Sequence, residues 1–334
     1  MNRQRHPKPG TRPLVVIVAS VLGLVLALQG TAGAEGSKGR AKVGICHRTG
    51  PDGGFRLVSE RATRAHARHG DLVGVQSSAE CQVPTGPTAP TPPGRYLEEV
   101  FPEVTVERDL QYGAAPDENG VTENLLLDLY QPVGDTQALR PAIVWVHGGG
   151  FSGGNRGLEA GNADTFAKRG YVTTSISYRL RSGNIGQAIA DAQHDAQAAV
   201  RWLRANADRY GIDPDRIAIG GTSAGAITAL FVGNHAEDPG TSGNPGFRSD
   251  VQAAVSISGF GGHYSAGDAP AIMFHGTADP ILPYPLAVGT CDEIRRAGNV
   301  CEFHTYEGAG HILFVAHRED VQAKTAEFLL RQLF

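Results

Sequence analysis

Apolar strand-like runs alternate with helix-periodic segments from about Tyr96 to the end of the chain, and this alternation constrains the fold most. The run at Ala142–Val146 ends at a cluster of glycines, whereas Ile189–Asn206 carries apolar residues at helical spacing. Further strands are expected at Val172–Tyr178, Arg216–Ile219, Val251–Ile257, Ala271–Phe274 and Glu302–Tyr306, and further helices from Ala224, at Leu286–Arg296 and at Asp320–Leu333. This order predicts an α/β fold with a mostly parallel sheet covered by helices on both faces.

Two earlier segments, near Val104–Leu110 and Leu125–Tyr130, alternate apolar and polar residues with a period of two. We expect them to begin the sheet as antiparallel strands. The 334 residues are 41% hydrophobic and 19% charged, which suits a globular protein with a sizeable core. The net charge of −4 is mild and points neither to nucleic acid nor to an anionic membrane as a partner.

A Gly-x-Ser-x-Gly motif occupies residues 221–225, between an expected strand and an expected helix, with Ser223 at its centre. A serine on a sharp strand-to-helix turn projects its hydroxyl from the sheet edge, and glycines are needed where side chains would clash. The helix N-terminus also favours developing negative charge. The motif alone could arise by chance in a chain with 44 glycines, so its placement is what favours Ser223 as a nucleophile.

A His-Gly-Gly-Gly run at residues 147–150 directly follows the strand-like run at Ala142–Val146. Glycines let the backbone approach a ligand and point N–H groups at it, and each such donor stabilises an oxyanion by about 3–4 kcal/mol. A flexible loop and a nucleotide-binding turn are the alternatives, since Gly148, Gly150 and Gly153 partly mimic a dinucleotide motif. The helix and acidic residue that a dinucleotide site requires are not found downstream, so we favour an oxyanion site.

Asp279 and His311 each lie in a loop after an expected strand. An Asp in such a position can orient a histidine, which can take a proton from serine and return it to the leaving group. A turn Asp before proline and a surface histidine are the alternatives. His317 competes with His311 but has no glycine loop before it, and His275 is either a core residue or a neighbour of the site.

The chain order Ser223, Asp279, His311 is that of α/β-hydrolases and differs from the orders in other serine hydrolases. Together with the two glycine motifs, it makes the segment from Leu125 to Phe334 resemble carboxylesterases and lipases of the α/β-hydrolase superfamily. The resemblance implies a three-layer sandwich and a catalytic triad of those three residues. It also implies an oxyanion hole formed by the backbone N–H groups of Gly149, Gly150 and Ala224. Gly148 is an alternative donor.

The resemblance further implies ester hydrolysis through an acyl-enzyme, without a cofactor or a metal. Ser223 and Asp279 are 279 − 223 = 56 residues apart, which leaves little chain for a large lid. We therefore expect an open site for short-chain or polymer-linked esters, with a lipase or a feruloyl- or acetylxylan-type esterase as the alternative. A non-catalytic protein with the same fold that binds cell wall or polymer is the alternative outside the enzymes. A peptidase related to prolyl oligopeptidase is a further alternative, but it would need a propeller domain too large for the N-terminal region.

Residues 1–34 have the composition of a secretory signal peptide. Basic residues come first, an apolar run at Leu14–Leu28 follows, and Ala32-Gly33-Ala34 offers a small-x-small cleavage site. A membrane anchor is the alternative, but the run is shorter than the ~20 residues that span a bilayer, and no second run is long enough. We expect a protein secreted from the cell, with no stable membrane anchor.

The four cysteines form two pairs that are well separated in the sequence, Cys46 with Cys81 and Cys291 with Cys301. Cysteines in an exported protein indicate disulfides, and we predict one within each pair. Three connectivities are open to four cysteines, and sequence alone does not choose between them.

The Pro- and Thr-rich stretch at 83–95 predicts a linker between a small module at 35–82 and a catalytic domain at 96–334. The module resembles a short Cys/His module of secreted bacterial proteins, a likeness that implies no firm activity. Three interpretations of this module are open. It could be a unit held together by a disulfide, a zinc site, or a region at 41–81 that contacts cell wall or polymer. The zinc ligands would be Cys46, His47, His66, His69 and Cys81, and oxidation would remove the thiolates.

Overall fold

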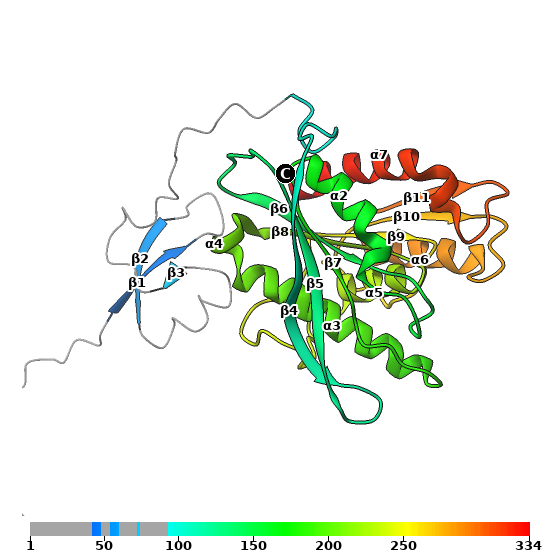
Figure 1. Ribbon diagram of the computed structural model, residues 1–334, viewed down its shortest axis with the longest axis horizontal. Helices are drawn as coiled ribbons and strands as arrows, with labels where there is room; N and C mark the ends of the chain where they lie inside the picture. The colour runs from blue at the N-terminus through cyan, green and yellow to red at the C-terminus, as the bar shows by residue number, and fades with distance from the viewer. Residues whose placement is uncertain (1–41, 48–53, 60–71, 74–92) are drawn as a thin grey trace, which may run out of the picture. The chain divides into compact units, whose positions relative to one another are not determined.

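The computed structural model describes residues 42–47, 54–59, 72–73 and 93–334 (Figure 1). The predicted signal peptide, most of the predicted linker and Cys81 lie outside these residues, as do the Cys46–Cys81 pairing and the zinc alternative. In the N-terminal region, β1 (Lys42–His47) pairs antiparallel with both β2 (Gly54–Ser59) and β3 (Leu72–Val73).

The large sheet has eight strands in the order β11-β10-β9-β8-β6-β7-β5-β4. Strand β4 pairs antiparallel with β5, β5 also pairs antiparallel with β7, and the remaining neighbours are parallel. The strands are β4 (Val104–Pro116), β5 (Thr122–Pro132), β6 (Arg140–Val146), β7 (Val172–Ile176), β8 (Ile212–Thr222), β9 (Ala253–Ile257), β10 (Ala271–Gly276) and β11 (Cys301–Tyr306). The predicted mostly parallel sheet with antiparallel first strands is confirmed.

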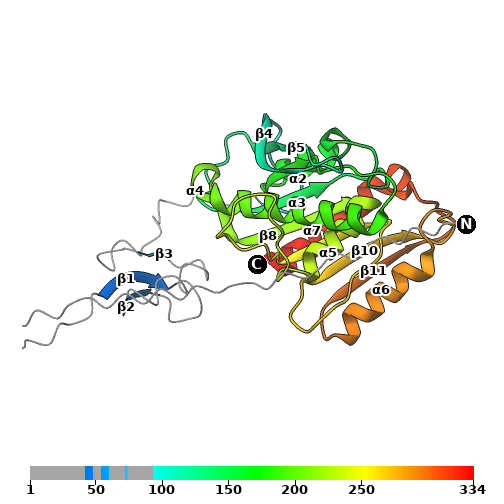
Figure 2. The same ribbon diagram turned by 90° about the horizontal axis from the view of Figure 1, so that it is seen from below.

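Helices cover both faces of this sheet, which makes a three-layer sandwich (Figures 1 and 2). One hydrophobic core joins the sheet to α3, α5 and α6, and the other joins it to α2 and α7. The helices are η2 (Arg156–Glu159), α2 (Ala160–Lys168), α3 (Ile185–Ala205), α4 (Ala207–Tyr210), α5 (Ala224–Asn234), α6 (Tyr284–Arg296) and α7 (Leu313–Leu333).

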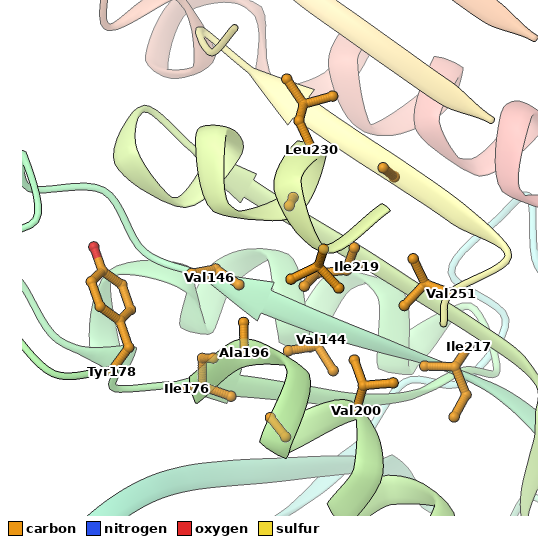
Figure 3. Close-up of a cluster of buried hydrophobic side chains, with 14 of the residues drawn as sticks. Val144, Val146, Ile176, Tyr178, Ala196, Val200, Ile217, Ile219, Leu230 and Val251 are labelled. Carbon is orange, nitrogen blue, oxygen red and sulfur yellow. The ribbon is translucent and has the colours of Figure 1, made fainter. Parts of the chain in front are cut away.

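Strand β6 shows why its sequence is a continuous apolar run. All seven of its residues are buried, because alternate side chains enter opposite cores. Trp145 packs on Phe166 of α2, with the ring centroids 5.3 Å apart. On the other face, Val144 lies in the same cluster as Val200 of α3 (Figure 3). Full burial of each large side chain stabilises the fold by about 1.5–3 kcal/mol, so β6 anchors both layers.

Two helices differ from the sequence-based expectation. Helix α2 was not predicted: its buried apolar face consists only of Ala163, Phe166 and Ala167, among glycine and polar residues. Helix α7 begins at Leu313, earlier than the expected start at Asp320, and it is kinked at His317. The kink interrupts the apolar periodicity, so the sequence marks only the second half of the helix.

The predicted Cys291–Cys301 disulfide is confirmed, and it links α6 to the start of the edge strand β11 across a Cα–Cα distance of 5.6 Å. No helix in the described part of the chain is long and apolar enough to cross a membrane.

Candidate active site

Ser223 lies in a sharp turn between β8 and α5. Its backbone has φ of 57° and ψ of −118°, a strained conformation for a residue with a side chain. The backbone N–H of Ser223 donates a hydrogen bond of 2.9 Å to the carbonyl of Ile257, at the end of β9. The neighbouring strand thus holds the turn in place.

The two glycines of the motif are required by close packing against β6. A Cβ atom added to Gly225 would lie 1.9 Å from the carbonyl oxygen of Val146. A Cβ atom on Gly221 would lie 2.5 Å from that same oxygen and from the carbonyl of Gly225. Real Cβ contacts of this length do not occur, so only glycine lets the helix start this close to the strand.

The structure brings Ser223, His311 and Asp279 together from three separate loops at the carboxyl ends of β8, β11 and β10. His311 Nε2 lies 2.8 Å from Ser223 Oγ, and His311 Nδ1 lies 2.8 Å from Asp279 Oδ2. The other carboxylate oxygen of Asp279 accepts hydrogen bonds from the amides of Ile281 and Leu282. The histidine therefore has a hydroxyl on one nitrogen and a carboxylate on the other.

The environment of Asp279 keeps this carboxyl group ionised. Its side chain is buried, which raises its pKa, but hydrogen bonds from His311 and from the amides of Leu282 and Ile281 outweigh that effect. The pKa of Asp279 therefore lies below its usual value. An ionised Asp279 favours the tautomer of His311 that carries a proton on Nδ1 and leaves Nε2 free to accept one from Ser223.

Two further residues support this arrangement: Ser258, which the sequence did not single out, and His275, for which the sequence left open a place in the core or beside the site. Ser258 donates its hydroxyl to the carbonyl of His311 at 2.8 Å, which fixes the loop that carries the histidine. His275 Nε2 lies 2.8 Å from the carbonyl of Leu282 and 3.2 Å from Asp279 Oδ2. The signal for His275 was its position four residues before Asp279, whereas Ser258 follows β9 without a motif.

The competing histidine, His317, lies elsewhere. It occupies the kink of α7 and packs on the ring of Tyr306, with the centroids 4.6 Å apart.

The His-Gly-Gly-Gly loop lies against the nucleophile turn. A Cβ atom on Gly148 would be 3.2 Å from the Cβ of Ser223, so the two backbones approach closely there. Gly149 and Gly150 have φ of 122° and 62°, and a Cβ on Gly149 would be 2.1 Å from the carbonyl of Gly153. Ala224 is the first residue of α5. The role of Gly149, Gly150 and Ala224 as oxyanion donors stays a prediction.

His147 fixes the start of this loop from within the core. Its ring is buried, it stacks on Tyr178 at a centroid distance of 4.3 Å, and its carbonyl accepts the Tyr178 hydroxyl at 3.1 Å. Its Nδ1 lies 2.6 Å from the carbonyl of Gly148. Burial lowers the pKa of His147 more than the bond to that carbonyl raises it, so the imidazole is neutral. The neutral ring holds the start of the loop in place through these contacts.

Within the part of the chain that is described, no group of three or more His, Cys, Asp or Glu side chains could hold a metal ion.

Comparisons with known proteins show which proteins this chain is similar to. Residues 127–261 match the BD-FAE family, a span that includes the glycine loop and Ser223 but ends before Asp279 and His311. Phenmedipham hydrolase of Pseudarthrobacter oxydans is 36% identical over 115 residues, which cover 33% of this chain and 23% of that protein. The probable carboxylic ester hydrolase LipM of Mycobacterium tuberculosis is 26% identical over 255 residues, 63% of this chain and 57% of that protein.

Among solved structures, native esterase 2 of Thermogutta terrifontis is 27% identical with a TM-score of 0.59, covering 73% of this chain and 97% of that chain. Its propionate-bound form gives a TM-score of 0.60 at 27% identity, covering 69% of this chain and 94% of that chain. The alignments with the first curated relatives span a quarter or less of those proteins, for example 25% of an acetylcholinesterase of Trittame loki.

The fold, the strand-to-helix nucleophile turn and these likenesses define the chain as an α/β-hydrolase. Within that superfamily it is similar to serine-type carboxylesterases and lipases, and its residues 127–261 match the BD-FAE family.

Proposed function

We propose that this protein is a secreted serine esterase that hydrolyses short-chain or polymer-linked carboxylic esters through an acyl-enzyme. The hydrogen-bonded chain from Ser223 Oγ through His311 to Asp279 carries the proposal. A hydroxyl, an imidazole and a carboxylate in this order form the arrangement that activates a serine for attack on a carbonyl.

The chemistry follows from the contacts of His311. Its Nε2 takes the proton of the Ser223 hydroxyl as Oγ forms a bond to the ester carbonyl carbon. The bond from that carbon to the leaving alcohol oxygen then breaks, and the same Nε2–H protonates the alcohol. Water enters, gives a proton to Nε2 and attacks the acyl-enzyme. The carboxylic acid leaves, and the proton on Nε2 returns to Ser223.

Negative charge develops on the carbonyl oxygen during each attack. The backbone N–H groups of Gly149, Gly150 and Ala224 are the proposed donors to it, with Gly148 as the alternative. The close approach of the loop to Ser223 supports this assignment. Each donor aimed at the oxyanion would lower the barrier by about 3–4 kcal/mol.

Short acyl groups are favoured by two observations. The described segment between β9 and β10, residues 258–270, contains no helix that could form part of a lid. Thermogutta terrifontis esterase 2, which has a similar fold, has been solved with propionate and with butyrate bound. We therefore expect acetyl to butyryl esters to be hydrolysed better than octanoyl esters.

Export is supported by the signal-peptide pattern and by the Cys291–Cys301 disulfide, because disulfides persist in oxidising compartments. A secreted lipase of Gibberella zeae is 35% identical over 116 residues. For the N-terminal module we propose a contact with cell wall or polymer, which would present polymer-linked esters to the catalytic domain.

A panel of p-nitrophenyl acetate, butyrate and octanoate with a feruloyl ester tests the proposal. Ser223→Ala should abolish turnover of every ester that the wild type hydrolyses, because no other hydroxyl among residues 93–334 is bonded to His311 Nε2. Ser182→Ala is the matched control, since Ser182 is exposed and outside the hydrogen-bonded triad. Unchanged activity of Ser223→Ala would overturn the assignment, and a preference for octanoyl esters would favour the lipase alternative.

A further inference from the structure

A pocket with a volume of about 370 Å³ is formed by Arg201 of α3 and the segment at 239–247, which lies between α5 and β9. The residues that line it belong neither to the triad nor to the His-Gly-Gly-Gly loop. Its volume lies at the lower end of the ~300–1,000 Å³ that small-molecule sites span. The pocket is therefore a candidate for a second ligand site, separate from the proposed active site.

Arg201 is a buried cation in the wall of this pocket. The residue is only 2% exposed. Its Nε donates to the carbonyl of Gly243 at 2.8 Å, and its Nη1 donates to the carbonyl of Pro239 at 2.7 Å and to the hydroxyl of Ser249 at 2.8 Å. These bonds use three of the five N–H donors of a guanidinium group. Nη2, which carries the other two, donates to no acceptor among the described residues.

No carboxylate of the described residues neutralises Arg201, since all three of its acceptors are neutral. Asp238 and Asp250, which lie on either side of the segment, contact other side chains. Asp238 Oδ2 lies 3.2 Å from His194 Nε2, and Asp250 Oδ2 lies 3.4 Å from Nη1 of Arg248. Burial lowers the pKa of Arg201, but an arginine keeps its charge in a protein. A buried charge without a counter-charge is costly, so a specific reason for it is expected.

The rest of the lining is uncharged and mostly apolar. Phe247 is 46% exposed, and Pro239 and Pro245 line the same pocket, so an aromatic ring and two proline rings offer flat apolar surface. Neither a lysine nor a second arginine is among the lining residues, so the pocket matches one negative charge rather than a phosphate dianion. The planar fork of a guanidinium group also fits a planar carboxylate.

We propose that this pocket binds a small organic carboxylate with a flat apolar body, whose carboxylate accepts hydrogen bonds from Nη2 of Arg201 and whose body packs on Phe247. A neutral molecule of the same shape would leave the charge of Arg201 without a counter-charge and should bind more weakly. The site does not involve Ser223, so this proposal is independent of the proposed function.

The probe is 4-fluorobenzoate, whose binding to the protein is measured by fluorine NMR titration, with 4-fluorobenzamide as the neutral analogue of the same shape. We expect a Kd of about 1 mM or lower for the acid, and binding at least tenfold weaker for the amide. Glucuronate, a carboxylate without a flat apolar body, should compete with the probe at least tenfold less well than unlabelled benzoate.

Four variants locate the bound acid: Phe247→Glu, Phe247→Gln, Arg201→Met and, as the matched control, Arg296→Met at the exposed end of α6. Phe247→Glu adds a carboxylate that competes with the ligand for Arg201, whereas Phe247→Gln has nearly the same shape without the charge. We expect Phe247→Glu to bind the acid at least tenfold more weakly than Phe247→Gln. Arg201→Met should lose binding, and Arg296→Met should keep the Kd of the wild type.

Thermal melting reports whether each variant is folded. The Phe247 side chain is half exposed, so its two variants keep the test open if Arg201→Met, which loses three hydrogen bonds, does not fold.

Equal Kd values for the acid and the amide would overturn the proposal, as would equal Kd values for Phe247→Glu and Phe247→Gln, because the acid would then be held elsewhere. Absence of binding to the wild type at ten times the expected Kd would also overturn it. A wild type that binds the acid but hydrolyses no ester would refute the proposed function and leave this site intact.

Discussion

Removal of the Cys291–Cys301 disulfide gives a prediction whose size follows from its place in the fold. The bridge joins residues ten positions apart and links α6 to the edge strand β11, whose only partner among the described strands is β10. Without the bridge, the unfolded chain gains conformational entropy. In the chain-entropy model, this gain lowers the free energy of unfolding by about 3 kcal/mol at 25 °C for a loop of this length. Both cysteines are also buried, so their replacement by alanine leaves less packing at this corner.

Urea unfolding of the double Cys291→Ala, Cys301→Ala variant, followed by circular dichroism, measures this loss. With a slope of roughly 2–3 kcal/mol per M, the midpoint should fall by about 1 M. Reduction of the wild type by dithiothreitol should give the same shift in the unfolding of the eight-stranded sheet and its helices. Dithiothreitol would also open the predicted Cys46–Cys81 bridge, so the double variant should respond only in the N-terminal module and keep its main midpoint. Equal midpoints for the oxidised wild type, the reduced wild type and the variant would refute the reasoning.

Three more substitutions test the account. Burial raises the pKa of Glu159, at the junction of η2 and α2, from 4.5 to about 7 in the folded state, so the stabilising contribution of its proton is fully present below pH 4.5 and is lost as the pH rises through 7. Between pH 5 and 8.5 the wild type should lose about 2.5 kcal/mol of unfolding free energy relative to Glu159→Gln, and parallel pH curves from urea titrations would contradict this. Gly225→Ala places a Cβ 1.9 Å from the Val146 carbonyl and should abolish ester hydrolysis, with soluble expression and activity as the check. Asp279→Asn should reduce kcat by about 10⁴-fold because His311 takes the wrong tautomer, and a loss below tenfold in steady-state assays would exclude that role.

The sequence predicted the elements whose physics is local or strongly periodic. β6 and β8 are apolar runs that end at glycine motifs, so both the strands and the loops at their carboxyl ends could be placed. The chain order of Ser223, Asp279 and His311 was informative because parallel strands bring their carboxyl ends to one edge of the sheet.

Features that depend on tertiary contacts were missed. Helix α2 has a weak apolar face, and only its packing on β7 and Trp145 accounts for it. Gln322 donates a hydrogen bond to Asn162 across 160 positions, and no local pattern marks such a link. Ser258 supports His311 across 53 residues for the same reason.

The most direct test of the account is to find the residue that an organophosphate labels. Thermogutta terrifontis esterase 2 is phosphorylated by paraoxon, so the same reagent suits this protein. After reaction, peptide mapping by mass spectrometry should find one phosphoryl group, on Ser223, with loss of ester hydrolysis in proportion to labelling. Labelling at another residue, or full hydrolysis by a protein whose Ser223 is labelled, would contradict the account.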